Sequence, residues 1–262
     1  MEKQTFLKFS KGDDNAKLQQ IGKKLFSFSL PSGFTCPFAL ECFSKAVEKE
    51  GKVTIVDGKH TKFRCFSASQ ELVYTATRKQ RWYNFNLLRE KKTAEAMAQL
   101  IIVSIPAKAD IIRIHVGGDF FNKEYMKAWI LVAKQKPDMI FYAYTKSLNY
   151  WVELINEIPS NLKMNASRGG KSDHLIDEYN LKSAEVVFTE QEAIDKGLEI
   201  DHDDTHAFKQ DKSFALLLHG VQPAGTEASK ALQTLKKEEK GSYNREKIKK
   251  EMTDEKKFVN AA

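Results

Sequence analysis

Cysteine and proline are scarce in this chain, which has three cysteines and six prolines among its 262 residues. Secreted domains stapled by disulfides use many cysteines in even number, so an odd count of three argues against that class. The longest apolar run, around residues 100–105, ends at Pro106 and is too short to cross a bilayer. The first residues also lack the apolar core of a signal peptide. We therefore expect a soluble cytoplasmic protein with no membrane contact.

All three cysteines fall in the first quarter of the chain. Five residues separate Cys36 from Cys42 in FSLPSGFTCPFALEC, and 22 more precede Cys65 in KFRCFSAS. They could be three unrelated buried thiols, because free cysteine behaves as a small apolar residue. They could form a zinc site in which His60 completes a Cys₃His set. They could also hold an iron–sulfur cluster through three thiolates, with one iron left open to a ligand.

From Pro106 onward the chain alternates predicted strands and helices. We expect five βα units, with strands over residues 109–118, 139–147, 161–170, 184–189 and 213–220. A strand over residues 24–30 makes six. Such alternation requires a parallel sheet with right-handed crossovers, either doubly wound or in a full or partial barrel. We predict an α/β fold, a partial (β/α)₆ TIM-like barrel with parallel strands.

The expected domain covers residues 1–240 as one barrel-like unit. Its part over residues 24–105 is irregular, helical and cysteine-containing, and the regular units occupy residues 106–240. Within the first part we predict helices over residues 37–49, 69–92 and 93–104, with a loop or short hairpin over 51–67. Residues 241–262 form a highly charged tail.

Polar side chains alternate with apolar ones along the predicted strands. Buried parallel strands normally read as continuous apolar runs, so a shared polar face indicates a polar site inside the sheet or barrel. Ligands of β/α folds bind at the carboxyl ends of the strands. A single polar residue in a strand is usually just satisfied by a neighbour, but four successive units end in this way. The candidate catalytic residues on these strands are His115, Tyr144, Lys146 and His219.

Glycine follows several of these strands, as in Gly117-Gly118-Asp119 and Arg168-Gly169-Gly170. Glycine lets a backbone approach a ligand closely or adopt a positive φ. Backbone N–H groups where a helix begins also favour anionic groups.

The net charge of +7 is concentrated in places, and residues 77–92 carry six bases against one acid. Such a segment can contact nucleic acid, although a solvated helix face is the plainer explanation. The bases are Arg78, Lys79, Arg81, Arg89, Lys91 and Lys92. The run DHDDTH over residues 201–206 could hold a divalent cation or could be a solvated loop.

The order of these parts resembles the radical S-adenosylmethionine superfamily, whose members are built on a partial (β/α)₆ barrel. That resemblance implies that Cys36, Cys42 and Cys65 bind a 4Fe–4S cluster. It also implies that Gly117, Gly118 and Asp119 match the motif that holds the amino group of S-adenosylmethionine. Candidates for its ribose or carboxylate contacts are Asn165, Ser167 and Arg168. The usual cysteine spacing in that superfamily is three and then two residues, shorter than here.

Four stretches of the chain, FSLPSGFTCPFALEC, KFRCFSAS, RIHVGGDFFNKEYMKAW and FYAYTKS, also resemble the gene product 88 family of phages and plasmids. This resemblance implies a mobile-element origin, and the host cytoplasm as location, but no chemistry.

We therefore expect a radical S-adenosylmethionine-like iron–sulfur enzyme that acts on nucleic acid or a nucleotide. The alternative is a zinc-binding β/α-barrel protein without redox chemistry that binds nucleic acid or modifies its bases. A third hypothesis is a nucleic-acid-binding module that holds no metal.

Overall fold

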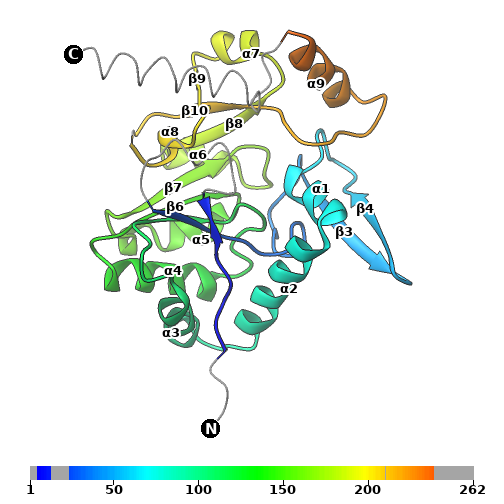
Figure 1. The fold of residues 1–262 in the computed structure, drawn as a ribbon. Helices are drawn as coiled ribbons and strands as arrows, with labels where there is room; N and C mark the ends of the chain where they lie inside the picture. Colours follow the sequence, from blue (N-terminus) through cyan, green and yellow to red (C-terminus); the bar gives the residue numbers. More distant parts are fainter. Residues whose placement is uncertain (1–4, 13–23, 210, 239–262) are drawn as a thin grey trace, which may run out of the picture.

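The computed structural model of the protein describes residues 5–12, 24–209 and 211–238 (Figure 1). Its centre is an eight-stranded sheet in which only the short edge strand β1 runs antiparallel to its neighbour. The predicted α/β class with a mostly parallel sheet is thus confirmed. In order across the sheet the strands are β1 (Ser10–Lys11), β2 (Leu25–Phe28), β5 (Ile111–Ile114), β6 (Ile140–Thr145), β7 (Leu162–Ser167), β8 (Ser183–Val187), β10 (Phe214–Leu217) and β9 (Glu199–Ile200).

The strand order from β2 to β8 and β10 follows the chain without reversal. A doubly wound sheet reverses its order at a switch point, whereas a β/α barrel adds each strand beside the last. Among the described residues no pairing joins the edge strands β1 and β9, so the sheet is open and no closed barrel is formed.

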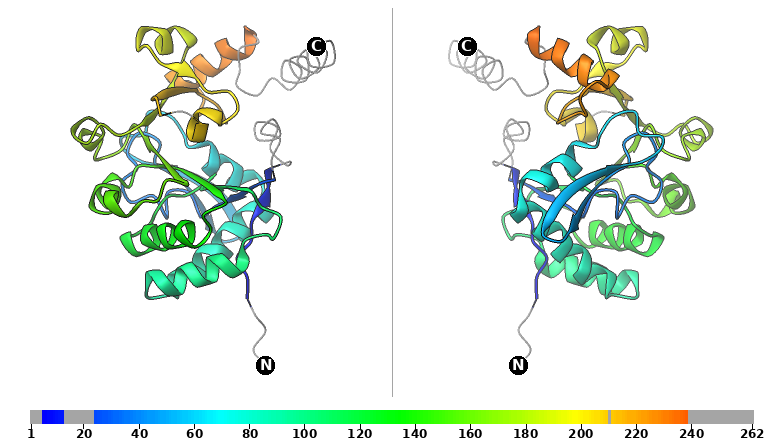
Figure 2. Two further views of the ribbon diagram at one scale, coloured as in Figure 1. Left: turned by 90° about the vertical axis from the view of Figure 1, so that its left-hand side faces the viewer. Right: turned by 90° about the vertical axis from the view of Figure 1, so that its right-hand side faces the viewer.

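Helices cover one face of the sheet, and α3, α4, α5 and α6 stack along that side (Figure 2). The main apolar core lies between these helices and the sheet. In it, Phe28, Ile114 and Phe141 from the strands pack around Trp129 of α4. Asn122 caps α4 by accepting a hydrogen bond from the Tyr125 N–H at 2.8 Å, a contact worth about 1 kcal/mol. The helices that connect the parallel strands or follow the last of them are α3 (Ala94–Ser104), α4 (Lys123–Gln135), α5 (Leu148–Glu153), α6 (His174–Glu178), α7 (Glu190–Asp195) and α9 (Glu227–Lys237).

The opposite face of the sheet carries the polar side chains. The short helix α8 (Thr205–Lys209) packs on β6 and β7 from this side, with the Phe208 ring 5.3 Å from that of Tyr142. The cysteine-containing segment lies over the carboxyl ends of the strands. It continues into α1 (Phe66–Val73) and α2 (Thr75–Arg89). The polar face is therefore closed at the bottom by α8 and covered at the top by residues 30–73.

The predicted helix over residues 37–49 is wrong. Residues 37–43 form turns, and β3 (Ser44–Lys49) pairs antiparallel with β4 (Lys52–Asp57) in a separate hairpin. The turn residues Glu50 and Gly51 both have positive φ, as tight hairpin turns require. Gly51 is therefore a turn residue, not the residue that ends a helix.

The other predicted elements are present with shifted ends. The predicted helix over residues 69–92 is two helices, because Tyr74 is extended and separates α1 from α2. The predicted helix after residue 147 ends early and continues as a 3₁₀ turn, η3 (Ile155–Glu157). Strand β9 and helix α8 lie where a loop is expected. The predicted tail over residues 241–262 lies outside the described residues. No helix in the described part of the chain combines the length and apolar character needed to cross a bilayer.

Candidate functional site

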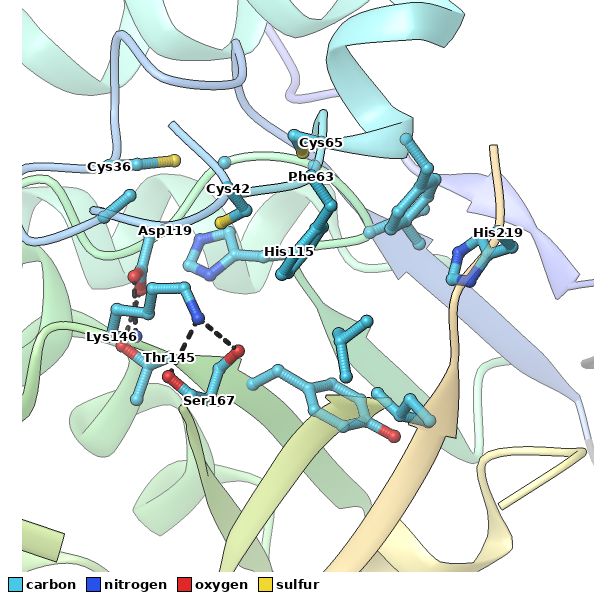
Figure 3. Close-up of a pocket in the computed structure, with 18 of the residues that line it drawn as sticks. Cys36, Cys42, Phe63, Cys65, His115, Asp119, Thr145, Lys146, Ser167 and His219 are labelled. Atoms are coloured by element: carbon cyan, nitrogen blue, oxygen red, sulfur yellow. Dashed lines mark hydrogen bonds between the residues drawn. The ribbon is translucent and has the colours of Figure 1, made fainter. Parts of the chain in front are cut away.

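A cavity of about 180 Å³ opens where the parallel strands end. Its walls come from the carboxyl ends of β5, β6 and β7 and the residues just after β5 and β6, from β8 and β10, and from the cysteine-containing segment above them (Figure 3). Eleven predicted site residues line this pocket. They are Cys36, Cys42, Cys65, His115, Gly117, Gly118, Asp119, Tyr144, Lys146, Ser167 and His219.

The three cysteines meet at this pocket from two segments, the loop that carries Cys36 and Cys42 and the residue that precedes α1, Cys65. All three are free thiols, and their side chains lie along one wall above His115 and Asp119 (Figure 3). Burial raises the pKa of Cys36 and of Cys42, and it raises the pKa of Cys65 to about 11. The thiols are therefore protonated at neutral pH and must lose protons to bind a metal.

The sulfurs are spread more widely than one zinc ion requires. Asp201, Asp203 and His206 form the one described group of three or more metal-type ligands whose atoms all lie within 4.8 Å of one another, so the three thiols do not form such a group. A zinc ion, about 2.3 Å from each thiolate, holds its sulfur ligands roughly 4 Å apart. An iron–sulfur cluster binds each thiolate through a different iron, so its ligands stand further apart. The donor set fits the larger group better.

Backbone hydrogen bonds fix the loop that carries Cys36 and Cys42 onto the strand ends. The Leu30 N–H donates to the Gly117 carbonyl at 2.8 Å, and the Glu41 N–H donates to the Gly169 carbonyl at 2.9 Å. Cys65 is held beside them, because its N–H donates to the Ser44 hydroxyl at 3.3 Å. The thiols are therefore attached to the loops that follow β5 and β7.

The glycine pair after β5 is required by this packing. A Cβ on Gly117 would lie 2.1 Å from the Ser67 hydroxyl, and one on Gly118 would lie 2.6 Å from the Thr35 hydroxyl. Gly118 also has a φ of +85°, which L side chains rarely adopt. The close approach predicted for a ligand is thus made here by the protein's own N-terminal segment.

The Asp119 carboxylate joins the ends of β5 and β6. It accepts hydrogen bonds from the Thr145 hydroxyl at 2.6 Å and from the N–H groups of Phe120 and Lys146 at 2.7 and 2.8 Å. Burial raises its pKa to about 6, despite these donors. Three bonds leave room for one more on a carboxylate, which has about four acceptor sites.

The Lys146 ammonium is fully used by the protein. It donates to the Ser167 carbonyl at 2.9 Å and to the Ser167 hydroxyl at 2.8 Å (Figure 3), and also to the Arg168 carbonyl. An ammonium has three donors, so none remains for a substrate. Lys146 therefore ties β6 to β7 and gives the pocket a fixed positive charge.

A buried ionic cluster forms the floor of the pocket. Arg113 of β5 pairs with Asp204, and the Tyr142 hydroxyl donates to the same carboxylate at 3.1 Å. The Tyr144 hydroxyl lies 3.5 Å from its other oxygen. Burial raises the pKa of Tyr144 well above its ordinary value, so the phenol stays neutral.

Three predicted site residues do not line the pocket. His60 is exposed in the turn after β4, so it does not join the thiols. Asn165 is buried beneath the pocket, where its amide donates to the carbonyls of Ala143 and Ala207. The Arg168 side chain points to Asp177 on α6. Of these three, only Arg168 reaches the site, through its backbone carbonyl.

Sequence reasoning missed the apolar lining and three charged groups, Arg64, Arg113 and Asp204. Phe63, Phe66, Val186, Leu216 and Leu218 form apolar walls that limit water in the pocket. Alternation along β8 and β10 could have shown which of their residues share a face. Asp204 lies in the run DHDDTH, which the sequence marks as a possible cation site, but its place in the pocket comes from the tertiary packing of α8.

The basic segment divides into buried and exposed residues, so two of the six bases named for a nucleic-acid contact are not available at the surface. Arg81 is buried in an ion pair with Glu71 at 2.7 Å, and Arg78 donates to the Glu71 carbonyl and to Glu48. Helical periodicity places both on the packed face of α2. The exposed bases are Lys79, Arg89, Lys91 and Lys92.

Comparisons with known proteins identify relatives without naming a chemistry. The sequence model of a family described as gene product 88 matches residues 5–240. A gene 88 protein of Mycobacterium phage L5 is 28% identical over 148 residues, which cover 53% of this chain and 54% of the relative. One of Mycobacterium phage D29 is 30% identical over 148 residues, with the same coverage of 53% and 54%. The chain thus spans about half the length of these curated relatives. No solved structure matches.

Proposed function

The chain belongs to the gene product 88 family, and from its own residues we propose that it is an iron–sulfur enzyme of the radical S-adenosylmethionine type. The predicted family membership is confirmed, and the curated relatives are phage proteins. The comparisons give no support to the radical S-adenosylmethionine resemblance, so the proposal rests on this chain alone.

The observation that carries the proposal is the convergence of three cysteines on one pocket at the carboxyl ends of the strands. Cys65 is separated by 22 residues from the loop of Cys36 and Cys42, and unrelated buried thiols have no reason to share one cavity across that separation. Their position agrees with the rule that β/α proteins carry their chemistry at this edge. In this proposal β2, β5, β6, β7, β8 and β10 are the six strands of a partial (β/α)₆ barrel.

The proposed cluster ligands are the thiolates of Cys36, Cys42 and Cys65, which leave one iron without a protein ligand. When bound, such a cluster supplies the electron for reductive cleavage of S-adenosylmethionine. Asp119 keeps one acceptor site for the amino group of that molecule. The Ser167 hydroxyl accepts from Lys146 and still has its own hydrogen to donate.

The apolar walls have a role in this proposal as well. Phe63, Val186, Leu216 and Leu218 line the same cavity as the thiols. Apolar walls expel water from a closed site, which would strengthen the electrostatic contacts of the bound molecule and prevent side reactions with water.

We further propose that the substrate is nucleic acid or a nucleotide, contacted through the exposed part of the basic segment. Lys79 is exposed on α2 near Trp82, and the Trp82 ring lies 4.8 Å from that of Phe34. The Lys45 ammonium lies 4.8 Å from the Phe34 ring centroid. Aromatic rings beside cations are typical of single-strand binding surfaces, where bases stack and phosphates pair with charge.

Anaerobic reconstitution with iron and sulfide tests the cluster. We expect a brown protein with visible charge-transfer absorption, and iron and sulfide content that falls sharply in Cys36→Ala, Cys42→Ala and Cys65→Ala. His60→Ala is the matched control, because His60 lies away from the pocket, and it should reconstitute as wild type. A colourless protein that binds zinc, with loss of zinc in the cysteine variants, would instead establish the zinc alternative. Wild type that takes up neither metal would contradict both.

A further inference from the structure

His115 is a buried residue in an uncommon backbone conformation. It directly follows β5 and has a φ of +66°, in the left-handed region where non-glycine residues are rare. Histidine there costs on the order of 1–2 kcal/mol. Such strain collects where the position of a side chain matters for function.

The ring is held tightly on one side only. Its Nε2 lies 3.0 Å from the Tyr125 hydroxyl, and its edge packs against Phe120 with 4.8 Å between ring centroids. Its Nδ1 is buried and has no hydrogen-bond partner. The ring also lines the pocket, below Cys42 and beside Asp119 in Figure 3. A buried nitrogen left without a partner destabilises the folded protein, and a bound molecule that pairs with it would remove that cost.

The hydrogen bond to Tyr125 decides which ring nitrogen carries the hydrogen. Burial raises the pKa of Tyr125, so its hydroxyl keeps its hydrogen and needs an acceptor. If Tyr125 donates to Nε2, the imidazole hydrogen lies on Nδ1. If Nε2 instead carries the hydrogen and donates to Tyr125, both the phenol hydrogen and the Nδ1 lone pair lack partners. That arrangement leaves two groups unpaired, whereas the first leaves only Nδ1–H.

We propose that His115 donates a hydrogen bond from Nδ1–H to an acceptor oxygen or nitrogen of the small molecule bound in the pocket. The other polar groups there are largely committed to the protein, since Lys146 has no donor left and Asp119 one acceptor site. Besides the Ser167 hydroxyl, His115 is therefore a donor that the pocket offers to a carbonyl, a carboxylate or a ring nitrogen of the ligand.

This assignment separates His115 from acid–base catalysis and from metal ligation. Burial lowers the pKa of its imidazole to about 3, so it is neutral at physiological pH and has no proton to give as an acid. A nitrogen that carries hydrogen also has no lone pair for a metal. The residue thus binds the ligand and leaves the metal to the thiols.

The tautomer can be tested on the protein without any ligand. Nitrogen-15 NMR of labelled histidine distinguishes Nδ1–H from Nε2–H, and the His115 signals are those missing in His115→Asn. We expect the Nδ1–H tautomer in wild type. In Tyr125→Phe the Nδ1–H preference should weaken. An Nε2–H tautomer in wild type overturns the proposal.

The ligand contact is tested with S-adenosylmethionine as the probe, and this part rests on the proposed function. Asparagine tolerates positive φ and keeps a side-chain N–H, so His115→Asn should bind within about threefold of wild type. His115→Leu should bind about tenfold more weakly, with unchanged iron and sulfide content. Wild-type affinity in the leucine variant, or loss of its iron, overturns the proposal. Failure of the wild type to take up a cluster refutes the proposed function, while the NMR result still decides the tautomer.

Discussion

The Asp204 carboxylate forms a buried ion pair with the Arg113 guanidinium, although 91 positions separate the two residues in the chain. The pair connects the segment that leads into α8 with β5, under the floor of the pocket. Tyr142 adds a hydrogen bond to the same carboxylate. The segment of α8 is thus held on the polar face of the sheet by an ion pair as well as by side-chain packing.

Removing one charge of this pair should destabilise the protein strongly. Asp204→Asn keeps a residue that tolerates the positive φ of 68° at this position, but leaves the Arg113 charge buried without its partner. We expect a loss of about 3 kcal/mol or more in the free energy of unfolding, measured by urea denaturation. The exposed pair of Lys123 and Glu153 is the control, and Glu153→Gln should cost less than about 1 kcal/mol. Equal losses in the two variants would contradict a buried ionic floor.

Gly118 can be compared with a glycine of nearly identical backbone but open surroundings. Gly118 has a φ of +85° and would place a Cβ 2.6 Å from Thr35, whereas Gly225 has a φ of +83° and nothing within 4 Å. Gly225→Ala should lose only the conformational cost, about 1 kcal/mol. Gly118→Ala should lose clearly more, because the loop of residues 30–35 must also move. Thermal unfolding of both variants checks this, and similar losses would show that the packing at Gly118 is dispensable.

The stability of the protein should depend on pH through His115. The pKa of this residue is lowered to about 3 in the folded protein, so its stabilising contribution is present above pH 6.5 and is lost as the pH falls toward 3. The pKa of Asp119 is raised to about 6 in the folded protein, so its stabilising contribution is present below about pH 4 and is lost as the pH rises toward 6. The wild-type profile therefore partly conceals both effects.

Comparison with His115→Asn should reveal the histidine effect alone. Relative to wild type, the variant should gain about 2–3 kcal/mol of stability between pH 7.5 and 4.5. Denaturant unfolding at several pH values measures this difference. A constant difference between the two proteins would show that His115 is not buried in its neutral form.

Nucleic-acid binding should depend on the exposed bases of α2. We expect Lys79→Gln with Arg89→Gln to weaken binding of a single-stranded oligonucleotide and to reduce the slope of log affinity against log salt by roughly 1–1.5. The control is Lys236→Gln with Lys237→Gln, which removes the same charge from exposed positions of α9. Fluorescence anisotropy at several salt concentrations compares them. If both double variants lose affinity equally, binding reflects net charge only.

Much of the fold follows from local pattern in the sequence. The alternation of strands and helices after Pro106 predicts the parallel sheet, since each apolar run is bounded by Gly, Pro or a capping residue. The stretch SKAVEK was misread because its Lys, Ala and Glu favour helices. The chain turns back at Glu50 and Gly51, which both have positive φ, so SKAVEK is the first strand of a hairpin. Glu is uncommon at the first position of such a turn, and the sequence therefore predicts the hairpin only weakly.

The site was predictable where it depends on strand ends and less so elsewhere. His115, Asp119, Lys146 and Ser167 follow from their positions at or just past the ends of successive strands. Arg78 and Arg81 lie in a basic stretch that would be expected at the surface. Both are buried because they bind Glu71 of α1, Arg81 through its carboxylate and Arg78 through its carbonyl. These partners are only 7 and 10 residues apart, but they lie on two helices, and the turn at Tyr74 that brings the helices together has no clear pattern in the sequence.

The hairpin formed by β3 and β4 lies entirely between Cys42 and Cys65. Its base is closed by hydrogen bonds from Lys62 and Phe63 to the Glu41 carbonyl, at 2.7 and 3.2 Å. The two thiols are therefore neighbours across the base of the hairpin, and its length adds residues without adding distance. A hairpin of another length on the same base would leave both sulfurs in place. A search for the site by fixed cysteine spacing would miss them, whereas a search by the strand ends that hold the thiols would not.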